Sequence, residues 1–394
     1  MTEHPVNERT DQRRRDCLCG VRRIVVKVGS QVLSRDGSLD EEVFGALAVQ
    51  IAALRQRGYV VAVVSSGAVA SGRFLLGLTE RPRSIPLKQA AAAAGQPALM
   101  HRYHCCFAAH GLRVAQVLLT SDDLHNRRRF LNARRTMNTL FELGIVPIIN
   151  ENDTVAVEEI KLGDNDRLSS LVTNLVEAEL LVILTDVDGF FDADPREHPA
   201  ATRYSFIEQL TEEHLGRATT TRGDLGLGGM ITKLEAARQA AQSGASTIVA
   251  RGVVANVLLR LLAGEDLGTF IAAAADIGAR KHWIAYTARS CGELVVDAGA
   301  VTALVDRGKS LLPSGVVAVL GDCGVGDPVR VLGPDGAEVA RGLVCYGASD
   351  LRRIAGRRTS EIASVLGAKF YDEVIHRNDL VVTIDHRQTD SQQE

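Results

Sequence analysis

Small, polar and charged residues come at or just after several apolar runs of this chain, where each run would leave a sheet. Four runs carry them: Lys27 and Gly29 for 23–28, Ser66 for 59–64, Asn150 and Asp153 for 145–149, and Thr185 and Asp186 for 180–184. Lysine ammonium groups and glycine backbone amides bind phosphate, and carboxylates hold such cations in position. Together these residue types are typical of phosphoryl transfer.

Two further loops carry similar chemistry. One is Gly163-Asp164-Asn165-Asp166, and the other is the glycine-rich run 226–233, which ends in Lys233. Taken singly, the first is more often an ordinary helix N-cap and the second a flexible connection. Combined with two lysines, both loops favour a phosphate site. The sequence contains no G-x-x-x-x-G-K-[ST] and no H-R-D or D-F-G set, which excludes P-loop and protein kinase classes.

The elements that must position these residues alternate between strand and helix. Short apolar runs predict strands at 23–28, 59–64, 113–119, 145–149, 180–185 and 246–250. Val43, Leu47, Ile51 and Leu54 have the spacing of one helical face. Continuous apolar strands indicate a sheet covered on both faces, and ligands collect at the carboxyl ends of such strands. We therefore expect an α/β domain over 21–280, with an open, mostly parallel sheet sandwiched by helices.

The pattern of apolar and polar residues changes near residue 280. Short strands separated by Gly and Asp follow, for example at 293–297, 316–320 and 327–332. We expect a small β-rich domain over 288–370 and a C-terminal segment with a polar tail over 371–394. Residues 1–20 are polar and carry no long apolar stretch, so they predict a disordered extension rather than a secretory signal.

Composition narrows the function classes. The chain has 394 residues, 46% of them hydrophobic, and a net charge of −3, which favours neither nucleic acid nor an anionic membrane as a partner. No apolar run approaches the roughly 18–20 residues that span a bilayer, so we expect a cytoplasmic protein with no membrane partner. The seven cysteines form no C-x-x-C pair, and Cys17-x-Cys19 has no second pair. We expect no protein-bound metal site.

These motifs closely resemble the glutamate 5-kinase branch of the amino acid kinase family, in order from about residue 22 to 368. The matching motifs are 26–30 (VKVGS), 66–68 (SGA), 130–134 (FLNAR), 149–153 (INEND), 161–166 (KLGDND), 185–186 (TD) and 228–233 (GGMITK). The C-terminal module, with Leu312-Pro313, Gly321, Tyr346 and 349–356, resembles a PUA domain. The resemblance therefore implies an amino acid kinase domain followed by a PUA domain.

The resemblance also implies roles for individual residues. Lys27, Lys233 and Asp166 would be catalytic, and Ser66, Asn150, Asp153 and Asn165 would bind glutamate. The ATP site would be formed by Lys27, Gly29, Thr185, Asp186, Leu227, Gly228, Gly229, Met230, Ile231, Thr232 and Lys233. Mg²⁺ would sit mainly on the phosphates of ATP. The chain departs from the family at Leu227, where threonine is usual, and in the extension 1–20.

The implied activity is ATP-dependent phosphorylation of the γ-carboxylate of L-glutamate to L-glutamyl 5-phosphate, the first step of proline biosynthesis. The resemblance further implies feedback inhibition by proline, a homotetramer, and transfer of the product to glutamate-5-semialdehyde dehydrogenase. One alternative is another kinase of the fold, acting on N-acetylglutamate, aspartate or UMP; Asp153 favours a substrate with a free α-amine. A second is an RNA-associated PUA protein, but residues 290–367 carry eight basic and nine acidic residues, so we expect no RNA partner.

Overall fold

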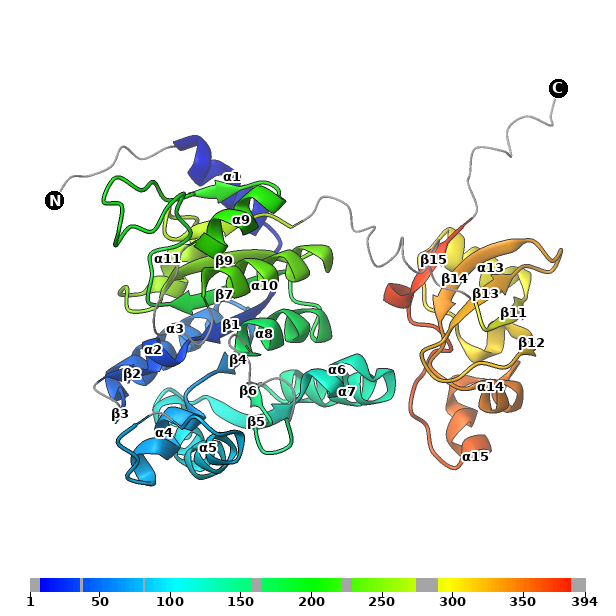
Figure 1. Ribbon diagram of the computed structural model, residues 1–394. Helices are drawn as coiled ribbons and strands as arrows, with labels where there is room; N and C mark the ends of the chain where they lie inside the picture. Colours follow the sequence, from blue (N-terminus) through cyan, green and yellow to red (C-terminus); the bar gives the residue numbers. More distant parts are fainter. Residues whose placement is uncertain are drawn as a thin grey trace. The chain divides into compact units, whose positions relative to one another are not determined.

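The structure is a computed structural model that describes residues 8–35, 38–80, 82–156, 164–220, 229–273 and 290–383. The chain divides into two compact units, Met1–Asp276 and Ile277–Glu394 (Figure 1). The first unit is built on a mostly parallel sheet with helices, and the second on a separate small sheet. The predicted fold class is therefore confirmed.

The sheet of the first unit has eight strands in the order β5-β6-β4-β1-β7-β9-β10-β8. The strands are β1 Arg23–Val28, β4 Val60–Ser65, β5 Arg113–Leu119, β6 Ile145–Glu151, β7 Leu180–Thr185, β8 Phe206–Ile207, β9 Ser246–Arg251 and β10 Thr269–Ile271. All neighbours are parallel except β9 and β10, which are antiparallel. A separate hairpin pairs β2 Ser34–Arg35 with β3 Ser38–Leu39.

Helices cover both faces of this sheet, as Figure 1 shows. Helices α8 and α10 pack on one face, and α3, α5 and α11 on the other. The helices are α1 Glu8–Leu18, α2 Ser30–Leu33, α3 Glu41–Gln56, α4 Ala68–Leu75, α5 Ile85–Ala108, α6 Ser121–His125, α7 Arg127–Glu142, α8 Asp164–Leu175, α9 Glu212–Thr220, α10 Met230–Gln242 and α11 Val257–Leu262. Within the described ranges, every helix is too short or too polar to span a bilayer.

The alternation of side chains along β1 explains how a lysine comes to lie inside the molecule. Ile24, Val26 and Val28 belong to the apolar core that β1 shares with α3 and α5. Because successive side chains of a strand point to opposite faces, Lys27 lies on the other face. That is the face covered by α8 and α10. The strand therefore supplies only apolar side chains to one layer, and it supplies the buried Val25 and the ammonium group of Lys27 to the other.

The structure differs from the predicted disordered extension over 1–20, because residues 8–18 form helix α1. Arg14 of this helix is 1% exposed, and it forms an ion pair with Asp266 over 2.9 Å. Its guanidinium donates to four backbone carbonyls, those of Ser205, Glu265, Leu267 and Gly268. Burial lowers the pKa of Arg14 to about 10, so the side chain remains a cation at neutral pH. This cage of carbonyls holds α1 on the first unit.

The second unit has five strands in the order β12-β11-β13-β14-β15. They are β11 Gly292–Val296, β12 Val316–Gly321, β13 Pro328–Leu332, β14 Glu338–Leu343 and β15 Leu380–Val382, and only β11 and β13 are parallel neighbours. Helices α13 Ala298–Val305, α14 Ala348–Ile354 and α15 Ile362–Leu366 accompany them, with the 3-10 turns η2 Pro313–Gly315, η3 Thr359–Glu361 and η4 Arg377–Asp379. Strand β15 joins this sheet from beyond the predicted boundary at residue 370.

Candidate active site

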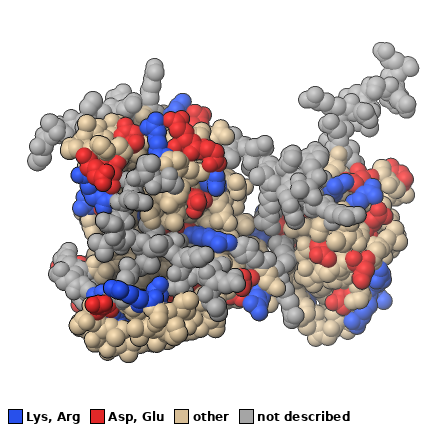
Figure 2. All heavy atoms as spheres, viewed as in Figure 1, with Lys and Arg blue, Asp and Glu red and all other residues tan. Residues whose placement is uncertain are grey.

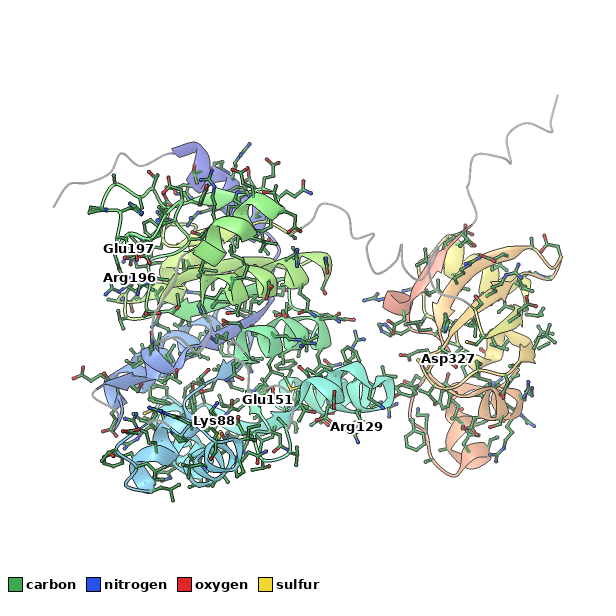
Figure 3. The ribbon with its side chains drawn as sticks, viewed as in Figure 1. Lys88, Arg129, Glu151, Arg196, Glu197 and Asp327 are labelled. Atoms are coloured by element: carbon green, nitrogen blue, oxygen red, sulfur yellow. The ribbon has the colours of Figure 1, made fainter. Side chains whose placement is uncertain are left out.

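A cavity of about 630 Å³ opens where the central strands β1, β4, β6 and β7 end. Glu151, the last residue of β6, is labelled in Figure 3 and lines this cavity. Most of the site residues predicted from the sequence also line it: Lys27, Gly29, Ser66, Asn150, Asp153, Asn165, Asp166, Thr185, Asp186, Gly229, Met230 and Lys233. The structure thus brings together residues that are up to about two hundred positions apart in the chain.

The other predicted site residues lie elsewhere. Ile231 and Thr232 belong to the first turn of α10 and do not line the cavity. The hydroxyl of Thr232 instead donates to Asp166 over 2.8 Å. Leu227 and Gly228 lie outside the described residues.

A charged cluster forms the floor of the cavity. Asp166, near the start of α8, forms ion pairs with Lys27 Nζ of β1 through Oδ1 over 2.6 Å and with Lys233 Nζ of α10 through Oδ2 over 3.3 Å. All three side chains are buried, with Asp166 only 1% exposed. One carboxylate thus fixes two ammonium groups that come from two separate elements, β1 and α10.

The charged groups of this cluster shift one another's pKa values. Burial acts to raise the pKa of Asp166, but the ammonium groups of Lys27 and Lys233 and the hydroxyl of Thr232 hold it below its usual value. Burial lowers the pKa of Lys233, and the Asp166 carboxylate opposes that shift without cancelling it. The two lysines carry one positive charge more than Asp166 neutralises. Such a surplus in a buried site attracts an anion.

Backbone geometry keeps the walls of the cavity open to that anion. Gly67, at the start of α4, has φ 112°, a conformation that favours glycine. A Cβ on Gly29 would lie 3.3 Å from the carbonyl oxygen of Leu184 and 3.9 Å from Lys27 Nζ. Helix α10 begins at the cavity wall, next to Gly229. Amides at a helix start are suited to phosphate.

A chain of side-chain amides forms another wall. Asn165 Nδ2 donates to Ser66 Oγ over 2.9 Å, to the Ser65 carbonyl over 3.1 Å and to Asn150 Oδ1 over 3.1 Å. Asn150 Nδ2 in turn donates to Gln96 Oε1 over 2.8 Å. At the other end of the chain, Asn165 Oδ1 is buried and accepts no hydrogen bond from any described residue. This oxygen is an acceptor that lacks a donor.

Asp153 supplies a second acceptor in the cavity, and its side chain is half-buried. Burial raises the pKa of its carboxyl group to about 6, and no neighbouring cation counters that rise. Across the described ranges, no side chain forms an ion pair or hydrogen bond with it. Asp153 is half-buried, and a carboxylate that is partly withdrawn from water without a partner is costly, so this position favours a positively charged ligand.

Several residues of the site were missed by the sequence reasoning. Arg73 of α4 and Arg196 line the cavity, and Arg196, labelled in Figure 3, pairs with Asp194 over 2.8 Å. Tyr103 of α5 is buried, and its hydroxyl donates to Ser65 Oγ over 2.9 Å. Gln96 had a signal in the sequence, since Gly95-Gln96-Pro97 interrupts an alanine-rich stretch. The other three have no local signal of that kind.

Sequence comparison supplies the remaining observation. The profile of the amino acid kinase family matches residues 22–251, which is more than half of the chain. The chain belongs to the amino acid kinase family. The profile of the PUA domain matches residues 292–366, so the predicted pair of domain families is confirmed.

Named relatives of this amino acid kinase match nearly its whole length. A protein named glutamate 5-kinase from Geobacter sulfurreducens is 53% identical over 367 residues, which cover 93% of this chain and 98% of that protein. Another of the same name, from Syntrophotalea carbinolica, is 51% identical and covers 94% of this chain and 99% of that protein. The resemblance to the glutamate 5-kinase branch is thereby confirmed. Membership of this kinase family implies the use of ATP.

Proposed function

We propose that this chain transfers the γ-phosphoryl group of ATP to the γ-carboxylate of L-glutamate, giving L-glutamyl 5-phosphate, the first step of proline biosynthesis. One observation carries the proposal: a buried acceptor, Asn165 Oδ1, and a half-buried carboxylate, Asp153, share a cavity with the Lys27–Asp166–Lys233 cluster, and neither has a donor among the described residues. The acceptors suit an α-ammonium group, and the lysines suit a phosphoryl group. The names of the closely similar relatives support the same substrate.

Asp153 favours glutamate over the acetylated alternative. Its carboxylate would form a charge-assisted hydrogen bond with the α-ammonium group, which is about twice as strong as a neutral one. N-Acetylglutamate offers only a neutral amide there, so the half-buried Asp153 would stay without a counter-charge. Ser66, Asn150 and Asn165 would complete the substrate contacts. Aspartate has the ammonium group but is one methylene shorter, so its side-chain carboxylate would not reach the lysines while the ammonium stays bound.

The lysines would act on the transferring group. A γ-carboxylate oxygen attacks the γ-phosphorus, a new P–O bond forms, and the bond from that phosphorus to the β–γ bridging oxygen breaks, so that ADP leaves with the electron pair. Lys27 and Lys233 neutralise charge on the phosphoryl oxygens, and Asp166 holds both ammonium groups in place. Because the nucleophile is already an anion, the reaction needs no general base.

ATP would occupy the side of the cavity lined by Gly29, Thr185, Asp186, Gly229 and Met230. Thr185 Oγ1 donates to Asp186 Oδ1 over 3.0 Å, which fixes the end of β7. Asp166 is already compensated by two lysines, so it is poorly suited to hold a metal ion. That charge balance fits Mg²⁺ held mainly by the phosphates of ATP, where it would neutralise their charge.

An RNA-binding function has weaker support. Figure 2 shows acidic and basic side chains mixed over the visible face of the C-terminal unit, and a phosphate backbone is bound by surfaces of predominantly positive charge. We therefore propose a catalytic rather than an RNA-associated protein. Inhibition by proline, a homotetramer, a cytoplasmic location and hand-over of the product to glutamate-5-semialdehyde dehydrogenase stay predictions of the family resemblance.

A side-by-side assay tests the proposed substrate. The full chain is given ATP and Mg²⁺ with L-glutamate, L-aspartate, N-acetyl-L-glutamate or UMP, and ADP release is measured. Hydroxylamine is added in parallel, because it traps an acyl phosphate as a hydroxamate. We expect glutamate to give the highest kcat/KM and a stoichiometric hydroxamate. A higher kcat/KM for any of the other three would refute the assignment.

A further inference from the structure

Gln96 lies at the outer end of the amide chain that lines the cavity. It belongs to α5, a helix that contributes no residue to the cavity lining. Its Oε1 accepts from Asn150 Nδ2 over 2.8 Å, and Asn150 Oδ1 accepts from Asn165 Nδ2 over 3.1 Å. Gln96 therefore contacts the proposed glutamate site only through Asn150.

Two backbone groups favour one direction of hydrogen bonding along this row of side-chain amides. The Ser65 carbonyl can only accept, so the Asn165 amide must turn its Nδ2 toward it. The backbone N–H of Glu151 can only donate, and it donates to Asn150 Oδ1 over 2.9 Å. These contacts favour one orientation of the two asparagine amides, in which Asn150 Nδ2 faces Gln96 Oε1. Asn150 Nδ2 therefore needs an acceptor, which Gln96 Oε1 provides. In the same orientation, Asn165 Oδ1 remains free to accept a hydrogen bond from a ligand.

The backbone of Gln96 is held firmly enough to serve as an anchor. Gly95 packs against α4 so closely that a Cβ there would lie 2.0 Å from the Ala68 carbonyl oxygen. A Cβ on Gly72 of α4 would likewise lie 1.7 Å from the Ala91 carbonyl oxygen. Helix α4 begins next to Ser66, which Asn165 contacts. The two ends of the amide chain are therefore tied to helices in direct backbone contact.

We propose that Gln96 is a positioning residue for amino acid recognition: its Oε1 orients Asn150 and, through Asn150, keeps Asn165 Oδ1 available to the α-ammonium group of the substrate. The proposal rests on the proposed function, which supplies the amino acid ligand. The alternative is a purely structural role, in which Gln96 only satisfies the Asn150 amide and stabilises α5. The two roles differ in what a loss of the acceptor does to substrate binding.

Three substitutions in the full chain separate these roles. Gln96→Met keeps the length of the side chain and removes the acceptor, Gln96→Lys replaces the acceptor with a donor, and Gln96→Glu keeps an acceptor. Gln116→Met is the matched control, because Gln116 of β5 is exposed and does not line the cavity. The measurements are kcat, KM for glutamate, KM for ATP and the melting temperature.

We expect Gln96→Met and Gln96→Lys to raise the KM for glutamate by about 5- to 20-fold, since an unsatisfied buried amide is the cost of losing the acceptor. The kcat at saturation and the KM for ATP should stay within about threefold, because neither depends on the α-ammonium contact. Gln96→Glu should keep the KM for glutamate within about threefold, and Gln116→Met should match the unmodified chain.

The outcomes that overturn the proposal are distinct. A normal KM for glutamate in both Gln96→Met and Gln96→Lys removes the positioning role. The same is true if Gln96→Glu is as impaired as Gln96→Met, or if all three variants lose kcat and melting temperature together, which is the pattern of a purely structural residue. An unmodified chain that does not phosphorylate glutamate overturns the proposed function itself, which the control chain reveals before any variant is compared.

Discussion

Asp153 links the ionisation of one carboxyl group to substrate affinity. Its pKa of about 6 in the empty site means that it is ionised at pH 7.5 and mostly protonated at pH 5. Only the ionised form attracts an α-ammonium group, so affinity must fall as the pH falls through 6. At pH 5 about one site in ten would be ionised. We expect the KM for glutamate to rise about tenfold between pH 7.5 and pH 5, as measured at saturating ATP.

The matched variant for this prediction is Asp153→Asn, which removes the titrating group. Its KM for glutamate should be high at pH 7.5 and should change little toward pH 5. The KM for ATP serves as an internal control in both proteins, because the nucleotide does not contact Asp153 in the proposed arrangement. A pH-independent KM for glutamate in the unmodified chain would contradict the assignment of Asp153 to the ammonium group.

The two buried lysines are expected to act on the transition state. Lys27→Ala and Lys233→Ala should each lower kcat by about 10²–10³, the usual effect of removing one preorganised charge from a reacting site. Lys88→Ala is the matched control, since Lys88 of α5, labelled in Figure 3, does not line the cavity. Initial rates at saturating substrates provide the measurement. If both buried-lysine variants kept a near-normal kcat, the proposed mechanism would be wrong.

The sequence correctly indicated which residues at the ends of strands would lie close together. Lys27, Asn150 and Thr185 were predicted as neighbours because the carboxyl ends of parallel strands meet at one edge, and all three line the cavity. Gln96 could not be predicted in this way. It lies in an alanine-rich helix whose sequence indicates only a packing role, and its partner Asn150 is 54 residues away. The interruption of that stretch at 95–97 marks the position, but it does not indicate a hydrogen bond to so distant a side chain.

Among the elements, the crossing of α4 and α5 depends on glycine. A Cβ on Gly95 would lie 2.0 Å from the carbonyl oxygen of Ala68, and a backbone group cannot rotate away as a side chain can. We expect Gly95→Ala to lower the free energy of unfolding by about 1–3 kcal/mol. Urea unfolding at neutral pH measures this change.

Gly45→Ala is a control with the opposite expected sign. Gly45 lies inside α3, where an added Cβ would meet nothing within 4 Å. Alanine is the better helix former, so this variant should gain about 0.5–1 kcal/mol. If both variants shifted stability in the same direction, close packing of α4 on α5 would not explain the effect.

The elements differ in how well the sequence predicted them. The strand β7 matches its prediction at 180–185 because Leu180, Leu181, Val182, Ile183 and Leu184 are all buried and no polar residue interrupts them. Strands β8 and β10 were not predicted, since two and three residues are too few to show a period. Helix α1 was missed because seven of its eleven residues are charged. Its stability comes from the carbonyls around Arg14.

For the whole molecule, the location of the cavity predicts that the C-terminal unit is not needed for turnover. All described residues that line the cavity precede position 234, and the first unit has its own core. A chain ending at residue 280 should therefore fold cooperatively and phosphorylate glutamate with a kcat within several-fold of the full chain. Any effect of the missing unit on Mg²⁺ dependence or inhibition should be about 1–3 kcal/mol, the usual size of coupling between sites.

Two measurements check this expectation. A thermal melt shows whether the shortened chain retains a single cooperative transition, and initial rates at saturating glutamate and ATP give its kcat. A shortened chain that melts cooperatively but has no turnover would show that the PUA-like unit is required for catalysis.

The cage of carbonyls around Arg14 has a consequence for the order in which the molecule is made. The guanidinium bonds to the carbonyls of Ser205 and Gly268, which come 191 and 254 residues later in the chain. A ribosome adds about 5–20 residues per second, so Gly268 is synthesised roughly tens of seconds after Arg14. Helix α1 is thus translated early but is among the last elements of the first unit to reach its binding place. In a nascent chain that stops short of β10, the Arg14 side chain is still in water. Only translation to β10 supplies all the carbonyls that let α1 dock on the rest of the first unit.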